Sequence, residues 1–299
     1  MDLLESARRE GLELETDAAL CDESGLDFVV VHAHDASGTA WIVRRPRRPN
    51  VLESARLEAR TLALVRPRLP VAVPDWRVFV DDVIAYPKLL GTTAVSFDPG
   101  AGPRWNLIDP LAPSAPFLDS LARAVAALQS IPLDEARDAG VRVSSLADER
   151  TWLAGCMQRT REALAPSQAL WQRWHGWLES DATWPPDSVM VHGDLHPGHW
   201  LLGDDGRLTG ILDWTAAQFG DPGTDFGLIH GAFGRSGLER LLDPFQRAGG
   251  KTWPGLLEHA HMRWTAFPAI AADFGLQTND AGVLEHARRL LVGAESDAH

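Results

Sequence analysis

Residues 191–226 read VHGDLHPGHWLLGDDGRLTGILDWTAAQFGDPGTDF, and this stretch decides the fold. Asp194 follows the short, β-favouring run 188–191, and Asp213 comes nineteen positions later, directly after a similar run at 208–212. The pattern predicts a strand, a loop, a short strand, a turn and another strand. Both carboxylates then lie on loops at strand ends, where functional residues are often mounted.

Two carboxylates in these positions suit phosphoryl transfer. That reaction needs one carboxylate to orient or deprotonate an attacking hydroxyl, and others to hold Mg²⁺ against the nucleotide phosphates. We expect Asp194 in the first role and Asp213 in the second. A second metal ligand is expected five positions after Asp194, where the sequence has His199.

These residues resemble the antibiotic phosphotransferases with a protein-kinase-like fold. In that family the catalytic loop runs His-x-Asp-x-x-x-x-Asn and a later Asp precedes an aromatic residue, which residues 192–194 and 211–214 match. His199 stands where the family has Asn. This departure resembles the macrolide 2′-phosphotransferase branch, as do LPVAVPDWRV (69–78) and AYPKL (85–89). The resemblance covers most of the chain.

The resemblance implies an α+β fold with two lobes. Residues 1–88 would form a small, mainly antiparallel β lobe with helices that binds the nucleotide, and residues 89–299 a larger, mostly helical lobe for catalysis and acceptor binding. That branch generally favours GTP, so GTP is the expected donor, with ATP as the alternative and Mg²⁺ as the cofactor. The implied partner is a macrolide antibiotic.

The composition fits an enzyme of this kind. The chain has 299 residues, of which 45% are hydrophobic and 23% charged, as in an ordinary globular protein. A net charge of −13 argues against nucleic acid or an anionic membrane as the partner. We expect a cytoplasmic protein, because Cys21 and Cys156 have no metal-like context and no signal peptide or membrane span is evident. We also expect a monomer.

The N-terminal part should alternate short strands with two helices. We expect helices at 2–10 and 52–65, and strands at 12–20, 28–31, 40–44, 71–80 and 83–86. Arg44 ends one strand at the point where kinase-like enzymes have a cation for the phosphates, and Glu58 on the second helix would pair with it. The family usually has Lys there, but the Arg fork also binds phosphate. The alternative is that residues 44–48, RRPRR, form a solvated basic turn.

The resemblance implies further nucleotide contacts. Ser24 lies in the loop between the first strands, although a plain hairpin explains that segment equally well. Ala85 and Tyr86 would belong to the hinge whose backbone meets the purine. Ile42 and Ile211 complete the expected set.

The C-terminal part should be helical after a loop at 91–116 that is rich in Gly, Pro and Ala. Helices are expected at 118–129, 146–164, 168–178, 226–233, 237–248, 255–272 and 279–293. Pro268 should kink one of them. The tryptophans of 168–178 could bind a flat ligand, but core packing is the favoured interpretation. Asp221 and Asp225 could be catalytic, but helix capping and loop hydrogen bonds are favoured.

In related kinases the last helices hold the acceptor. A macrolide is large and mostly apolar, so its cleft should be lined by apolar side chains. His230, Phe233, Trp264 and Phe267 are the candidates, each with core packing as the alternative. Asp194 would also contact the acceptor hydroxyl.

Three other functions remain open. His192, Asp194, His196 and His199 form a cluster that could bind zinc in a hydrolase, although we expect His192 to brace the loop through backbone carbonyls. An aminoglycoside kinase or another small-molecule hydroxyl kinase would keep the mechanism and change the acceptor. A nucleotide-binding pseudokinase would bind nucleotide without transferring phosphate.

Overall fold

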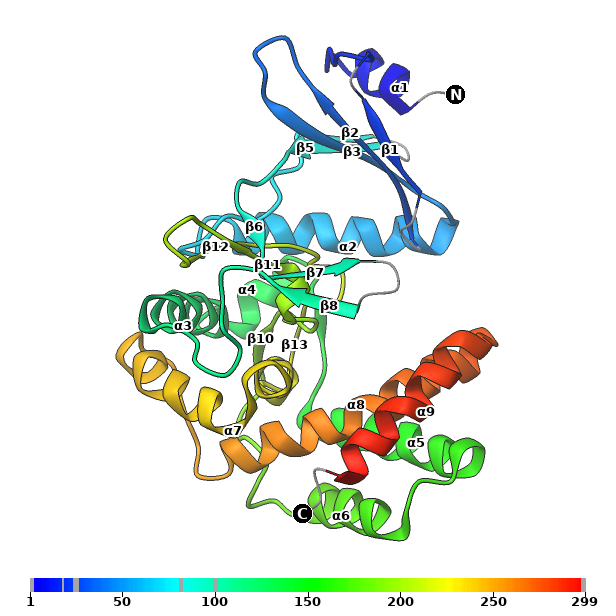
Figure 1. The fold of residues 1–299 in the computed structure, drawn as a ribbon, viewed down its shortest axis with the longest axis vertical. Helices are drawn as coiled ribbons and strands as arrows, with labels where there is room; N and C mark the ends of the chain where they lie inside the picture. The colour runs from blue at the N-terminus through cyan, green and yellow to red at the C-terminus, as the bar shows by residue number, and fades with distance from the viewer. Residues whose placement is uncertain (1–2, 18, 24–26, 81–82, 99–101, 297–299) are drawn as a thin grey trace.

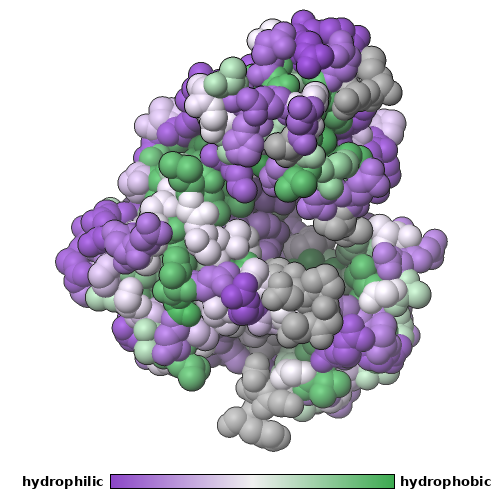
Figure 2. Space-filling view, turned by 45° about the horizontal axis from the view of Figure 1, so that its top comes forward, coloured by the Kyte–Doolittle hydropathy of each residue, from purple (hydrophilic) through white to green (hydrophobic). Residues whose placement is uncertain are grey.

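The computed structural model describes residues 3–17, 19–23, 27–80, 83–98 and 102–296. An antiparallel sheet lies at the N-terminal end and most helices lie at the other end, so the α+β class is confirmed (Figure 1). The face of the molecule in Figure 2 is hollowed between these two parts. One expectation, the nucleotide contact at Ser24, lies outside the described residues.

Five antiparallel strands form the N-terminal sheet. In spatial order they are β1 (Leu20–Asp22), β2 (Phe28–His34), β3 (Ala40–Pro46), β5 (Val83–Pro87) and β4 (Val78–Val80). Side chains alternate between the two faces, as a period of two requires. Helix α1 (Leu3–Arg9) contacts β3 and β5, and its Leu4 and Ala7 share a hydrophobic cluster with Val43 and Ala85. The opposite face carries Ile42 and Tyr86, which cluster with Ala55 and Ile84.

Helix α2 (Pro49–Val65) begins with proline in its first turn, where no backbone N–H is needed. Val51, Ala55, Leu62 and Val65 are buried at helical spacing. Glu58 falls on the same face and is only 1% exposed. The helix therefore carries a carboxylate toward the interior.

Two expectations for the first half of the chain are wrong. The strand expected at 12–20 is reduced to one isolated bridge between Leu14 and Asp35, and β1 begins only at Leu20. The loop expected at 91–116 contains β6 (Thr92–Thr93), β7 (Val95–Asp98) and β8 (Gly102–Trp105). β7 and β8 pair as a hairpin, whereas β6 pairs with a strand from the catalytic stretch. The partner of β6 is distant in the sequence, so local composition did not reveal this strand.

The helices of the C-terminal part are α3 (Ala115–Gln129), α4 (Leu133–Asp138), α5 (Leu146–Leu164), α6 (Gln168–Glu179), α7 (Gly223–Arg247), α8 (Leu256–Thr278) and α9 (Ala281–Ser296). α5 has the predicted bounds because Ser145 and Asp148 form a capping box at its start. α7 is bent at Gly234, whose φ is +66°. α8 runs through Pro268 as one helix. Trp174 and Trp177 of α6 are buried in a hydrophobic core, as favoured from the sequence.

The catalytic stretch forms the predicted series of short strands. They are β10 (Val189–Val191), β11 (Trp200–Leu202) and β12 (Leu208–Ile211), with the 3₁₀ turn η1 (Pro197–His199) before β11. β11 lies between β12 and β6 and pairs with both, while β10 pairs with β13 (Gln218–Gly220), which also pairs with β9 (Arg142–Val143). No helix in the described part of the chain is long and apolar enough to cross a membrane.

Candidate active site

The catalytic loop is anchored by His192. Its ring is fully buried, and its Nδ1 accepts a hydrogen bond from the Asp194 N–H at 3.2 Å. The other nitrogen, Nε2, therefore carries the hydrogen and donates it to the Leu212 carbonyl at 2.9 Å. Burial lowers the pKa of His192 to about 3, which keeps the ring neutral. The bracing role expected for His192 is confirmed, and it joins the Asp194 loop to the residue before Asp213.

Asp225, in the first turn of α7, fixes the same loop from the other side. Its two carboxylate oxygens accept the backbone N–H groups of His192 at 2.8 Å and Gly193 at 2.9 Å. Gly193 has a φ of +85°, and a Cβ there would overlap the Ala216 carbonyl, so the turn requires glycine. Asp225 is fully buried. The interpretation of Asp225 as a loop hydrogen-bonding residue is confirmed.

Asp194 emerges from this rigid loop with its side chain 41% exposed. Partial burial raises the pKa of Asp194. The nearby His199 opposes that rise, and the Asp213 charge adds to it. A carboxylate so placed can accept a hydrogen bond from a ligand hydroxyl and can take a proton from it.

His199 lies between the two aspartates. Its Nδ1 is 3.0 Å from the Asp194 carbonyl oxygen, which can only accept, so Nδ1 is the N–H donor. The lone pair of the neutral ring is then on Nε2, which lies 3.8 Å from Asp213 Oδ2. Burial acts to raise the pKa of Asp213, but His199 and the hydrogen bonds from Thr215 outweigh it and the pKa is lowered. In the uncharged form of His199, the Nε2 lone pair therefore faces an Asp213 carboxylate oxygen.

These two donors fit the expected Mg²⁺. Asp213 supplies the oxygen ligand that Mg²⁺ prefers, and His199 supplies a weaker nitrogen ligand or a contact through water. The backbone of Asp213 has a φ of +58°, a strained conformation for a residue with a side chain. The Thr215 N–H holds it by donating to Asp213 Oδ1 at 3.3 Å.

The alternative zinc cluster is not supported. Asp194, His196 and His199 have potential ligand atoms within 4.8 Å of one another. However, His196 Nδ1 accepts the Gly198 N–H at 3.0 Å, so its Nε2, which is 3.9 Å from Asp194, bears a hydrogen. Burial lowers the pKa of His196 to about 4, so the ring is neutral. His196 therefore offers no lone pair to a metal beside Asp194.

Arg44 and Glu58 form a buried ion pair near this loop. Arg44 Nη2 lies 2.7 Å from Glu58 Oε2, and the two side chains are 11% and 1% exposed. The guanidinium lies 4.3 Å from the Phe28 ring centroid and 4.7 Å from that of Trp76. Glu58 Oε2 also accepts from the Thr215 hydroxyl at 3.3 Å. Arg44 is therefore not part of a solvated turn, and the pair is linked to the Asp213 loop.

The other residues expected to contact the nucleotide do not all lie on the same side of the sheet. Ile42 and Tyr86 share the sheet face that carries Arg44. Ala85 does not, because its side chain packs toward α1 on the opposite face and its carbonyl accepts the Arg77 N–H at 2.8 Å. The expected contact between the backbone of Ala85 and the base stays a prediction. Ile211 is buried in the C-terminal core, two residues before Asp213.

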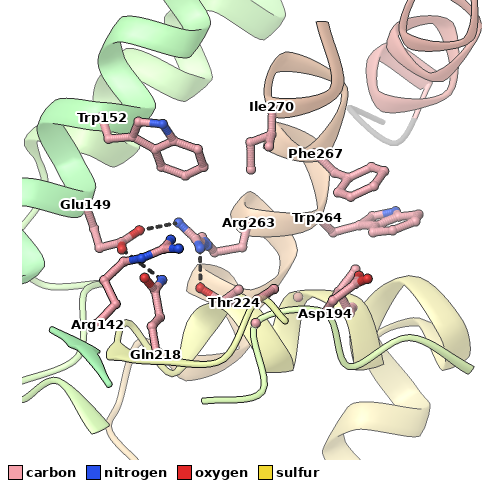
Figure 3. Close-up of a pocket in the computed structure, with 14 residues that line it drawn as sticks. Arg142, Glu149, Trp152, Asp194, Gln218, Thr224, Arg263, Trp264, Phe267 and Ile270 are labelled. Carbon is pink, nitrogen blue, oxygen red and sulfur yellow. Dashed lines mark hydrogen bonds and ion pairs between the residues drawn. The ribbon is translucent and has the colours of Figure 1, made fainter. Parts of the chain in front are cut away.

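A cavity of about 210 Å³ opens beside Asp194 (Figure 3). Its walls come from the catalytic loop and from β9, β13, α5, α7 and α8. The residues that line it are Arg142, Glu149, Trp152, Gly193, Asp194, Ala216, Gln218, Thr224, Gly227, Leu228, Arg263, Trp264, Phe267 and Ile270. Two of the four residues expected at the acceptor, Trp264 and Phe267, are among them. Their rings stack with centroids 5.9 Å apart.

The other two expected acceptor residues lie elsewhere. Phe233 packs in the hydrophobic core, where its ring stacks on Trp200 with centroids 5.6 Å apart. His230 is buried, and its Nε2 lies 3.2 Å from His261 Nδ1. Both residues face the helix packing rather than the cavity, because the apolar side of α7 is needed for the core.

Glycines position the cavity wall. Gly223, Gly227 and Gly231 are spaced by four along α7 and face α8. A Cβ at Gly231 would overlap the Trp264 ring, and one at Gly227 would crowd Arg263. The stripe lets α8 approach closely and places both side chains in the cavity. The four-residue glycine spacing was visible in the sequence, but its functional consequence was not predicted.

The chain matches the Phosphotransferase enzyme family over residues 22–259 and belongs to it. Among solved structures it is similar to the macrolide 2′-phosphotransferase MphH from Brachybacterium faecium, with 36% identity, a TM-score of 0.87 and 97% of each chain covered. A structure named macrolide 2′-phosphotransferase type I has 36% identity and a TM-score of 0.88, with 97% of this chain and 95% of that chain covered. A third relative, "Uncharacterized protein YcbJ" from Bacillus subtilis (strain 168), is 39% identical over 97% of this chain and 95% of its own length.

An aminoglycoside 2′-phosphotransferase-IIIa structure shares the fold, with 17% identity, a TM-score of 0.80, and 99% of this chain and 97% of that chain covered. The bilobal, protein-kinase-like fold expected from the sequence is therefore confirmed. The protein is a phosphotransferase.

Proposed function

We propose that this phosphotransferase moves the γ-phosphoryl group of GTP to the 2′-hydroxyl of the amino sugar of a macrolide. The balance of charge in the cavity beside Asp194 carries this proposal. Two carboxylates, Asp194 and Glu149, are matched by two arginines, Arg142 and Arg263, among aromatic and aliphatic side chains. An aminoglycoside carries several positive charges and would need an excess of carboxylates. The likeness to two macrolide 2′-phosphotransferases at 36% identity supports the same acceptor.

The size of the cavity supports entry of the sugar alone. Pockets that enclose a whole drug-sized ligand measure roughly 300–1,000 Å³, whereas this one is about 210 Å³. The amino sugar would enter with its 2′-hydroxyl at Asp194, and the lactone ring would stay outside. Trp152, which is 43% exposed at the cavity, would meet the apolar lactone.

The roles of the residues follow from this pose. Asp194 would accept a hydrogen bond from the hydroxyl and take its proton late, since positioning matters more than base strength when the transition state is loose. Arg44, held by Glu58, would offset phosphate charge. His199 and Asp213 would hold Mg²⁺, which supplies charge neutralisation at the phosphate oxygens when bound. GTP is proposed because the loop resembles the macrolide branch.

Mass spectrometry of acceptors incubated with the protein, Mg²⁺ and either GTP or ATP tests the proposal. The panel contains macrolides with and without a second sugar, and several aminoglycosides. Addition of one phosphoryl group to a macrolide, faster with GTP, is expected. Transfer to aminoglycosides alone would overturn the acceptor, and faster transfer from ATP would overturn the donor.

A further inference from the structure

Three aromatic rings lie around the guanidinium group of Arg44. The Arg44 Cζ atom is 4.3 Å from the ring centroid of Phe28 and 4.7 Å from that of Trp76. The ring centroid of Tyr86 is more distant, at 5.7 Å. All three rings are within the separation of about 6 Å at which an aromatic face attracts a cation. Because the Arg44 side chain is only 11% exposed, these rings take the place of much of its water.

The register of the N-terminal sheet places two of these rings beside Arg44. Val30 of β2 is the direct partner of Arg44, so Phe28, two positions earlier, is a diagonal neighbour on the same face. Tyr86 of β5 pairs with Ile42, two positions before Arg44, and is a neighbour on that face from the other side. The third ring comes from the segment that precedes β4. Three separate segments of the chain therefore supply a ring to one cation.

One ion pair holds the guanidinium group through one of its nitrogens. Nη2 of Arg44 lies 2.7 Å from Glu58 Oε2, whereas Nε is buried and has no hydrogen-bond partner among the described residues. A single N–H···O contact fixes the distance between the two groups, but it leaves the planar guanidinium able to turn about that contact. The aromatic faces restrict this motion, because a delocalised guanidinium stacks on them. The rings therefore determine the direction in which the other N–H groups of Arg44 point.

We propose that Phe28 and Trp76 are positioning residues for the phosphate-binding cation, and that they make this site specific for arginine. The inference rests on the proposed function, in which Arg44 offsets phosphate charge. A guanidinium binds phosphate best when its planar fork is aligned with the phosphate oxygens, so its orientation affects the affinity for the nucleotide. A lysine ammonium has no plane to stack on the rings, and it is a strongly hydrated point charge that would lose water at this buried position.

A double-mutant cycle between the cation and one ring tests this arrangement. The KM for the nucleotide is measured for the wild type, Arg44→Lys, Trp76→Leu and the double variant, with a macrolide as the acceptor. Arg44→Lys should raise this KM by about tenfold or more, through the loss of an aligned charged contact. Trp76→Leu should raise it by about threefold to tenfold in the wild-type background, but by about twofold or less in the Arg44→Lys background, where no guanidinium remains to be positioned. The macrolide KM should stay unchanged in all variants.

Two further variants separate positioning from packing. Trp76→Phe keeps an aromatic face and should restore most of the affinity for the nucleotide. Phe79→Leu is the matched control, because Phe79 belongs to the same hydrophobic cluster and packs against Trp76, with ring centroids 5.2 Å apart. This control should leave the nucleotide KM unchanged, and a rise equal to that of Trp76→Leu would overturn the positioning role.

The outcomes distinguish this inference from the proposed function. No phosphoryl transfer by the wild type to any macrolide would overturn the proposed function, and calorimetric titration with GTP and Mg²⁺ would still give the same cycle for binding. A wild-type nucleotide KM for Arg44→Lys, or an equal effect of Trp76→Leu in both backgrounds, would overturn the positioning role alone. If Trp76→Leu does not fold, Phe28→Leu replaces it in the cycle, and an equal effect in both backgrounds would again overturn the role.

Discussion

Two buried pairs of arginine and glutamate lie at the candidate active site, and they differ in how closely the two side chains approach each other. In the first, Arg44 and Glu58 are 2.7 Å apart, and Glu58 receives a second hydrogen bond from Thr215. In the second, Arg263 and Glu149 are 3.6 Å apart, and Glu149 Oε2 has no hydrogen-bond partner in the described part of the chain.

The difference shows that residue type alone does not define a role. Glu58 binds both Arg44 and Thr215, so it links α2 and Arg44 to the Asp213 loop, although Arg44 Nε is buried without a hydrogen-bond partner among the described residues. The Arg263 pair lies in the cavity wall, and both Glu149 Oε2 and Arg263 Nη1 are buried without a hydrogen-bond partner among the described residues. The first pair therefore joins α2 to the Asp213 loop, and the second forms part of the cavity wall.

Removal of Asp194, which neither pair can replace, should have the largest effect. Asp194→Ala should lower kcat by about a hundredfold or more, the usual contribution of a general acid–base group. Because the side chain is 41% exposed, the unfolding temperature and the nucleotide KM should change little. Steady-state kinetics and thermal unfolding measure both. Asp205→Ala, in the exposed turn before β12, is the matched control, and near-normal turnover of Asp194→Ala would reject the assignment.

The next largest effect should be on the free energy of unfolding, which should fall by different amounts when the two pairs are broken. Glu58→Ala leaves Arg44 buried without its counter-ion and should lower the free energy of unfolding by about 3 kcal/mol. Glu149→Ala should cost about 1 kcal/mol, because Arg263 keeps Asp221. Urea unfolding of the two variants gives the comparison. Equal losses would show that the second pair is as important to the fold as the first, and would contradict the distinction.

Local patterns predicted the part of the site that lies on one continuous stretch. We expected the two strands that end before Asp194 and Asp213, and the bracing by His192, because residues close in the sequence determine these features. Glu149 was not expected, since it lies on a helix in the charged run LADER (146–150), where nothing distinguishes a buried carboxylate from a solvated one. Its importance arises only when α5 packs near α8.

Pairing between distant segments explains the other errors. β6 was taken as loop because its partner β11 lies more than a hundred positions later, as in the pairing of Thr93 with Leu201. Ala85 and Tyr86 are neighbours in one strand, so their side chains face opposite sides of the sheet, and only the register with β3 shows that Tyr86 lies on the side of Ile42 and Arg44. Phe233 and Trp264 are both apolar helix residues, and only helix packing shows that Trp264 lines the cavity.

Loss of the link between Glu58 and the Asp213 loop should have a smaller effect. Thr215→Val removes the hydroxyl that donates to Glu58 and keeps the side-chain shape. We expect a loss of about 1.5 kcal/mol, or roughly tenfold in kcat/KM for the nucleotide, as for one hydrogen bond to a charged group. The required Mg²⁺ concentration should rise, while the macrolide KM should not. Thr215→Ser should restore activity, and failure of that rescue would show that the effect is one of packing.

The smallest effect should come from a substitution that displaces Trp264 in the cavity wall and leaves every charged side chain in place. Gly231→Ala places a methyl group against the Trp264 ring, which can swing because it is half-exposed. The cost should therefore be about 1 kcal/mol of unfolding free energy, together with a several-fold higher macrolide KM and an unchanged nucleotide KM. Gly176→Ala, in α6 with open space at its Cβ, is the control and should be neutral or slightly stabilising. An unchanged macrolide KM in the Gly231 variant would show that the Trp264 ring does not contact the acceptor.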